Sequence, residues 1–189
     1  MVKKLLLYLI FLTATELSTA SIDSNINPNI ELKIYLDAIK VNKPIKPKDK
    51  IYIQVTEYSN IYKPKEHRIP AYPKHWLQRE LSGLKNILLW HGVVESLEKK
   101  ELIISLIEQE LLPLNSDEPL GSVKLIMDNK HQGQKMLINW EQAGLKENVN
   151  IKKIKTKTKS TKTSQVIFEM QGKNSNYLIK FHTVTKLQK

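Results

Sequence analysis

Residues 30–41 read IELKIYLDAIKV, a stretch in which apolar side chains alternate with mostly polar ones. A β-strand turns successive side chains to opposite faces, so this period of two predicts a strand with one buried face. The apolar positions of that face are Ile30, Leu32, Ile34, Leu36 and Ala38.

Similar signals recur along the chain. Ile51, Ile53 and Val55 alternate in the same way, and a turn-rich stretch at residues 171–176 joins the last two strand candidates. Residues 59–75 contain three prolines and are predicted to be a loop, with a short helix or loop insertion near residues 74–85. About eight short strands without regularly alternating long helices predict a mainly β protein, an antiparallel β-sandwich. The further strand candidates are residues 87–94, 123–127, 136–140, 151–159, 166–170 and 178–184.

Residues 95–112 are ambiguous from the pattern alone. As a helix, the segment would place Ile103, Leu106, Ile107 and Leu111 on one face. As a strand, it would point Leu102, Ile104 and Leu106 inward.

The N-terminus has the three parts of a secretory signal peptide. Lys3 and Lys4 precede an apolar run at residues 5–12, and small residues precede an expected cut after Ala20. An uncleaved anchor or a buried first strand is the alternative. We therefore expect residues 1–20 to be a signal peptide, 21–29 a leader arm and 30–189 one domain. The protein would be secreted or periplasmic, and residue usage rich in lysine, asparagine and isoleucine favours a bacterial source.

The chain has no cysteine, which excludes disulfides, a thiolate nucleophile and a lipoprotein anchor. Its formal charge is +11, and removing two lysines and one glutamate with the signal peptide leaves +10. A field of this size favours anionic partners, although it also serves as a solubility device.

The order of these features resembles that of a C2 domain, the lipid-binding β-sandwich. The resemblance rests on IELKIYLDAIKV, DKIYIQV at 49–55, ILLWHGVV at 87–94 and ELIISLIEQELLPLNSDEPLGSVKLIM at 101–127. It covers about residues 30–140 and, if accepted, decides residues 95–112 in favour of a strand. Many C2 domains bind calcium between loops at one end. The family's acidic positions fall here on Asp49, Glu108, Glu110 and either Asp117 or Glu118. A solvated acidic loop is the alternative interpretation.

Residues 150–163 read NIKKIKTKTKSTKT. In a strand, Lys153, Lys155, Lys157 and Lys159 would share one face as a ladder for multivalent anions. Lys152 and Lys162 are further candidates for binding the anion. Lysines on an edge strand also prevent aggregation, and a Lys/Thr tract can be a loop. No aromatic residue lies inside the tract, so nucleic acid is not an expected partner.

None of the five histidines has a metal-binding or catalytic spacing, and we expect no enzyme. The leading hypothesis is a secreted module, in the manner of a bacterial effector, that binds an anionic membrane surface through the lysine tract. The alternatives are a protein–protein interaction module of the envelope or secretion apparatus, and an adhesin for acidic glycans.

Overall fold

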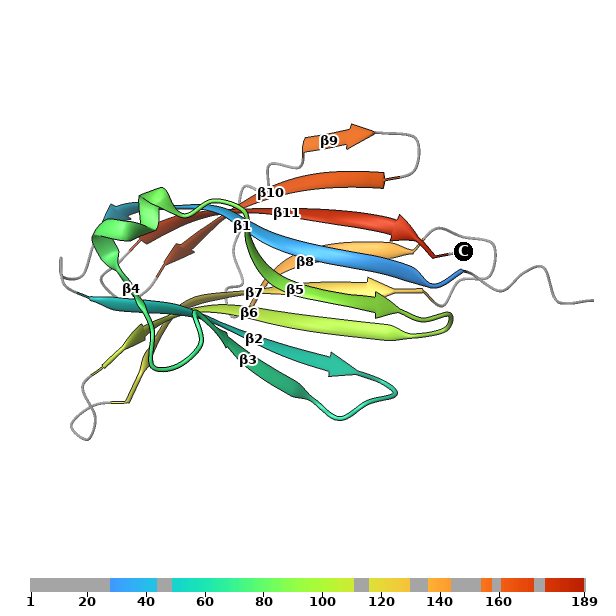
Figure 1. Cartoon of the computed structure of the whole chain (residues 1–189), viewed down its shortest axis with the longest axis horizontal. Coiled ribbons are helices and arrows are strands. Elements are labelled where there is room, and N and C mark those ends of the chain that lie inside the picture. Colours follow the sequence, from blue (N-terminus) through green and yellow to red (C-terminus); the bar gives the residue numbers. More distant parts are fainter. Residues whose placement is uncertain are drawn as a thin grey trace, which may run out of the picture.

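The computed structural model describes residues 28–43, 49–110, 116–129, 136–143, 154–157, 161–171 and 176–188. These residues form two antiparallel sheets that pack face to face (Figure 1). The predicted fold class, a mainly β antiparallel sandwich, is therefore confirmed.

The first sheet has four long strands and one short edge strand, in the order β5-β1-β11-β10-β9. Strand β1 lies between β5 and β11, because its alternating apolar residues make it suitable for the interior of a sheet. The bounds are β1 Ile30–Lys43, β5 Ile87–Val94, β9 Ile154–Lys157, β10 Thr161–Gln171 and β11 Asn176–Leu187.

The second sheet has the order β3-β2-β6-β7-β8, and the two-residue strand β4 also pairs with β2. A short 3-10 helix, η1 (Gln78–Gly83), follows β4, and the Glu80 carboxylate accepts a hydrogen bond from the Leu77 backbone N–H at its start. The bounds are β2 Lys50–Ser59, β3 Lys65–Ile69, β4 Trp76–Leu77, β6 Lys99–Gln109, β7 Glu118–Asp128 and β8 Leu137–Ala143.

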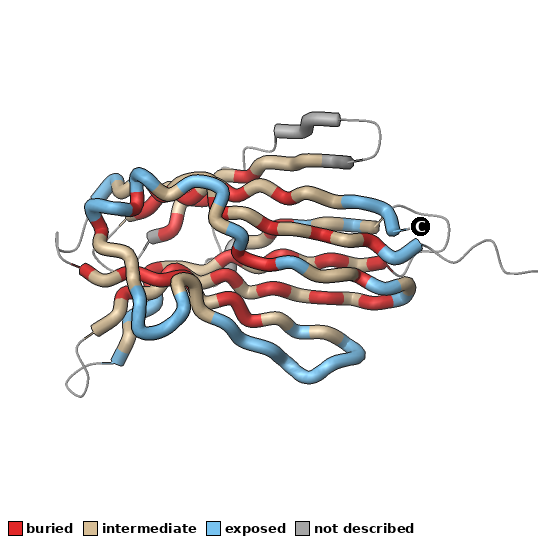
Figure 2. Tube along the Cα trace, in the orientation of Figure 1, coloured by how far each residue is buried: buried red, intermediate tan, exposed pale blue. Residues whose placement is uncertain are grey.

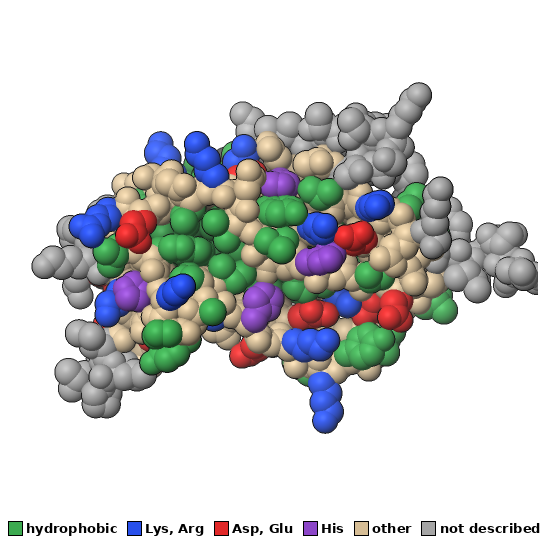
Figure 3. Space-filling view, viewed as in Figure 1, with side chains coloured by type: hydrophobic (Ala, Val, Ile, Leu, Met, Phe, Trp, Pro, Cys, Tyr) green, Lys and Arg blue, Asp and Glu red, His purple; other side chains and the backbone are tan. Residues whose placement is uncertain are grey.

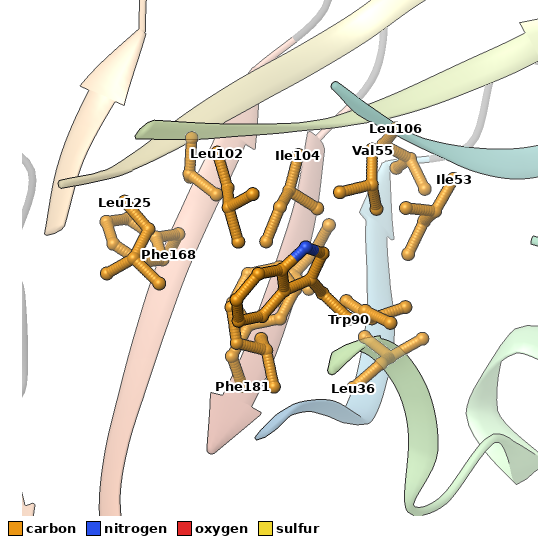
Figure 4. Close-up of a cluster of buried hydrophobic side chains, with 14 of the residues drawn as sticks. Leu36, Ile53, Val55, Trp90, Leu102, Ile104, Leu106, Leu125, Phe168 and Phe181 are labelled. Carbon is orange, nitrogen blue, oxygen red and sulfur yellow. The ribbon is translucent and has the colours of Figure 1, made fainter. Parts of the chain in front are cut away.

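One hydrophobic core lies between the sheets. Along β6 every second residue is buried, and the same alternation runs along β11 (Figure 2). Figure 4 shows Trp90 and Phe181 of the first sheet facing Val55 and Ile104 of the second. Each such side chain stabilises the fold by about 1.5–3 kcal/mol when it is fully buried. The core therefore holds a cysteine-free domain together by packing.

The strands run along the long axis of the molecule, so their connections gather at two opposite ends (Figure 1). At one end β2 and β7 begin and β6 ends, and we call it the carboxylate end after the acidic residues described below. At the other end β2, β5, β7 and β11 end and β6 and β8 begin. We call this the tyrosine end; it comprises residues 58–65, 95–99, 128–129, 137 and 186–188.

The structure resolves the ambiguity at residues 95–112 in favour of a strand. Strand β6 is extended because it is hydrogen-bonded on both sides, to β2 and to β7. It buries Leu102, Ile104 and Leu106, the three residues of the predicted strand face.

One local prediction is wrong. The predicted loop at residues 59–75 contains β3, whose polar residues KEHRI pair with β2 on one side only, as the edge of the sheet. The short helix expected near residues 74–85 is present as η1, and Trp76 and Leu77, just before it, pair with β2. No helix in the described part of the chain is long and apolar enough to span a bilayer.

Candidate functional site

Three strand ends bring acidic residues together at the carboxylate end. Antiparallel pairing of β6 with β7 sets Glu108 directly opposite Glu118, and Glu110 follows immediately after β6. Asp49 precedes Lys50, the first residue of β2, which pairs with Gln109. Residues separated by almost 70 positions in the sequence therefore become neighbours through the sheet register alone.

Three of these carboxylates converge. Glu108, Glu110 and Glu118 each offer an oxygen atom, and these atoms all lie within 4.8 Å of one another. Charges this close repel by on the order of 3 kcal/mol per pair at an effective dielectric constant of about 20. Water screens the exposed Glu118 more than the buried Glu108. A cation placed between the three oxygens would remove this repulsion.

Asp117 has a different role from its neighbour Glu118. Its two oxygens accept hydrogen bonds from the Tyr52 hydroxyl at 2.9 Å and from the Glu110 backbone N–H at 3.1 Å. Burial and this bond to Asp117 raise the pKa of Tyr52 to about 12. The Arg68 guanidinium lies 3.8 Å from the centre of the Tyr52 ring. Of the two residues that the sequence left as alternatives, the structure thus places Glu118 in the converging group and Asp117 in a supporting bond.

A buried tyrosine faces the same end from the opposite sheet. Tyr177, at the start of β11, is fully buried, and its hydroxyl has no hydrogen-bond partner among the residues that the structure describes. Burial raises the pKa of Tyr177 to about 12, and the nearby charges of Asp49 and Glu108 add to this rise. A buried hydroxyl without a partner costs free energy, so it is a second sign that a polar ligand belongs at this end.

The chemistry of this end suits a hard cation. Calcium takes six to eight oxygen ligands, and three carboxylates provide up to six when each binds through both oxygens. Of the five residues predicted from the sequence, Glu108, Glu110 and Glu118 converge. Asp49 lies close enough to raise the pKa of Tyr177, and Asp117 accepts a hydrogen bond from Tyr52. Whether calcium binds remains a prediction.

The predicted lysine ladder maps to the edge of the five-stranded sheet. Lys155 and Lys157 lie on β9. The register sets Lys157 opposite Lys162 of β10. Lys152, Lys153 and Lys159 lie outside the described residues.

Sequence reasoning missed a buried charged network at the tyrosine end. Lys100 Nζ lies 3.3 Å from both Glu57 and Glu98, donates to the Val93 carbonyl at 2.9 Å and approaches the Trp90 ring. Glu98 is fully buried. The run Glu98-Lys99-Lys100-Glu101 looks like a solvated turn in the sequence, and only the packing of the two sheets shows that Lys100 points inward.

Sequence reasoning also missed Tyr52 and Tyr177. Both sit in strands that read as ordinary alternating core segments, and nothing in the local pattern marks their hydroxyls. Their role at the carboxylate end emerges only from the packing of the two sheets, which places the start of β2 and the start of β11 at the same end of the molecule.

No protein-family model matches the chain, and no curated protein matches it either.

Proposed function

We propose that this protein is an exported, non-enzymatic sandwich of the C2-like kind that binds acidic phospholipid through lysines at the edge of its five-stranded sheet. The observation that carries the proposal is the register of β9 on β10, which sets Lys157 opposite Lys162. Among the described residues, β9 is the last strand on that side of the sheet.

Cations directly opposite each other on adjacent strands destabilise a sheet. Lys186, at the exposed end of β11, is opposite Thr161 of β10, so three adjacent strands carry a lysine at one end of the sheet. An anionic surface reduces the repulsion among these charges and gains about 1 kcal/mol for each lysine near it. The net charge of +11 acts in the same direction over a longer range.

The C2-like assignment is part of the proposal. Its support is the order of the motifs along the chain, together with their positions on β1, β2, β5, β6 and β7 of a two-sheet sandwich. Export rests on the N-terminal signal pattern.

Vesicle flotation tests this function. The protein is expected to float with vesicles containing phosphatidylserine or a phosphoinositide. With vesicles of neutral phosphatidylcholine it is expected to remain in the bottom fraction. The double variant Lys157→Glu/Lys162→Glu should bind at least about 30-fold more weakly, from two lost attractions of about 1 kcal/mol each.

The matched control is Lys40→Glu/Lys85→Glu, which changes the net charge equally at two exposed lysines elsewhere. It should retain most of the binding. Equal recovery on neutral and acidic vesicles at low salt would contradict the proposal. An equal loss in both double variants would show that net charge, and not this edge, attracts the protein.

A second candidate function, divalent-cation binding, is favoured by the unpartnered Tyr177 hydroxyl beside the converging carboxylates. Calcium is expected to raise the unfolding temperature, because a ligand that binds only the folded state stabilises it. Glu110→Gln should weaken this effect, whereas Glu66→Gln, on exposed β3, should leave it unchanged. An unfolding temperature that is the same in millimolar calcium and in chelator would exclude this function.

A further inference from the structure

Exposed apolar side chains gather at the tyrosine end. Of the eight large hydrophobic residues that are exposed in the described part of the chain, six lie there. In Figure 3 hydrophobic side chains reach the surface on the right-hand part of the molecule, beside basic and acidic side chains, and a further group lies left of centre. Scattered single apolar residues need no explanation, but a concentration at one end does. The six are Tyr58, Ile61, Tyr62, Leu97, Leu137 and Leu187, with exposed fractions of 42–60%.

Hydrogen bonds hold these connections in place. The Asn60 backbone N–H donates to the Lys99 carbonyl at 3.2 Å, and the Asn60 side chain accepts from the Lys99 N–H at 2.9 Å. These bonds tie the β2–β3 connection to the β5–β6 turn.

Two asparagines extend the same set of bonds across both sheets. The Asn129 side chain donates to the carbonyls of Glu95 and Pro28, and the Asn29 side chain accepts from the Ser96 N–H. The Asn29 carbonyl accepts from the Gln188 N–H at 3.0 Å. These hydrogen bonds link the connections that carry the exposed apolar residues, and we call this set of residues the apolar rim. The links keep the apolar side chains from folding back onto the core.

Leu97 is held in an unfavourable backbone conformation. Its φ is +67°, a region that suits glycine and disfavours a residue with a Cβ atom. Its N–H donates to the Asn129 carbonyl at 3.2 Å, and its side chain is 59% exposed. The chain thus accepts backbone strain to present a leucine to the outside, where water offers that leucine no stabilisation.

Lysines surround this apolar rim. Lys63, Lys65 and Lys186 are exposed at the same end, whereas Lys99, half-buried beside them, is paired with Glu101 at 2.7 Å. The register of the sheet places Lys162, opposite Thr185, at this end as well. Of the nearby acids, Glu57 and Glu98 are already paired with Lys100.

Tyr62 has the properties of a side chain that lies at a membrane interface. Its hydroxyl donates to Glu95 Oε1 at 3.1 Å, and this bond raises the pKa of Tyr62. With its hydroxyl satisfied, the ring can lie among lipid headgroups, where tyrosine is enriched in membrane proteins. Apolar side chains together with lysines are the combination that binds the interface of an anionic bilayer.

We infer that the tyrosine end inserts into the interfacial layer of an acidic phospholipid bilayer, with Tyr58, Ile61, Tyr62 and Leu97 as anchors. The inference rests on the proposed function, and it names the part of the molecule that enters the membrane. The strand register places Lys157 and Lys162 toward the same end of the molecule, while β9 lies across the molecule from the β2–β3 connection (Figure 1).

The absence of native cysteine allows a direct test. In Ile61→Cys the single thiol carries an environment-sensitive fluorophore at the tyrosine end. In Leu88→Cys the fluorophore sits on an equally exposed apolar position of β5, about six residues or 20 Å from the end of that strand. The emission at position 61 is expected to shift to the blue on phosphatidylserine vesicles, while that at position 88 stays constant.

Affinity gives the second measurement. Ile61→Ser is expected to weaken vesicle binding about tenfold, since it removes most of one partly inserted side chain. Leu88→Ser is the matched control and should bind like the wild type.

The outcomes separate the two proposals. Binding to acidic vesicles without a spectral shift at position 61 overturns the insertion and leaves the proposed function standing. No binding to acidic vesicles overturns both. A shift at position 61 caused by a soluble acidic glycan, and absent with vesicles, assigns this end to a different partner and overturns the insertion.

Discussion

Replacing Gly121 with alanine should destabilise the protein substantially, whereas the same change at Gly83 should not. Gly121 lies in β7 at the point where the register on β6 shifts between Leu106 and Ile107. Its φ is +153°, which residues with a Cβ atom rarely adopt. A Cβ atom added there would stand 2.8 Å from Met170 Cβ and 3.4 Å from Met170 Cα, across the core in the other sheet.

The magnitude follows from these two effects. The backbone strain costs about 1–3 kcal/mol. Overpacking costs a similar amount, about 1–3 kcal/mol, because the atom that blocks the new methyl group is a Cβ next to the backbone and cannot rotate away. Alanine also lowers the conformational entropy of the unfolded chain, and this offsets about 0.4–1 kcal/mol of the loss in stability. We expect a net loss of about 3 kcal/mol in the free energy of unfolding, and a fall of roughly 6–12 °C in the unfolding temperature.

Urea unfolding followed by far-ultraviolet circular dichroism measures this loss. Gly83→Ala is the matched control, since a Cβ at Gly83 in η1 meets nothing within 4 Å; its stability should stay within about 1 kcal/mol of the wild type. Because the close atom is Met170 Cβ, Met170→Ala should not rescue Gly121→Ala. A loss below about 0.5 kcal/mol at Gly121, a value typical of surface changes, would refute the reasoning.

Three further predictions concern the two ends of the molecule. The pKa values of Tyr52 and Tyr177 are raised to about 12 in the folded state, above the ordinary value of about 10, so both groups favour folding while protonated. The contribution of these two tyrosines to the free energy of unfolding should therefore be constant below pH 10 and fall between pH 10 and 12, by on the order of 2–3 kcal/mol per tyrosine; a double phenylalanine variant that is equally sensitive to alkali would contradict this. Lys100→Met should cost about 3–5 kcal/mol in urea unfolding, because it leaves the buried Glu98 charge without its cation, and a neutral result would show that the pair is dispensable. Leu97→Gly should keep or raise the stability by up to about 1 kcal/mol, since it relieves a positive φ, yet it should weaken binding to acidic vesicles; a parallel loss of both would argue that Leu97 serves only the fold.

The fold class was predictable because the sequence of each core strand alternates between apolar and polar residues. Strand β1 buries Ile30, Leu32, Ile34 and Leu36 in the predicted alternation. Strand β3 was missed because an edge strand with polar faces has no such signal; its backbone pairing with β2, and not its side chains, makes it a strand.

The candidate site was predictable only in part. The positions of Glu108, Glu110 and Glu118 came from the resemblance to a family, and the structure brings their oxygens together. The choice between Asp117 and Glu118 depended on which carboxylate Tyr52 reaches, and no local pattern contains that information. The apolar rim at the tyrosine end was not predicted at all, since its members come from three separate connections and from the end of β11.

By itself, the sequence determined the period of the strands, the absence of cysteine and the excess of positive charge, because each of these is a property of the chain read in order. Only the tertiary structure decided which side chains share an end of the molecule. The physical reason is that antiparallel pairing converts distant positions into neighbours through backbone hydrogen bonds, and those bonds form between groups that every residue except proline carries alike.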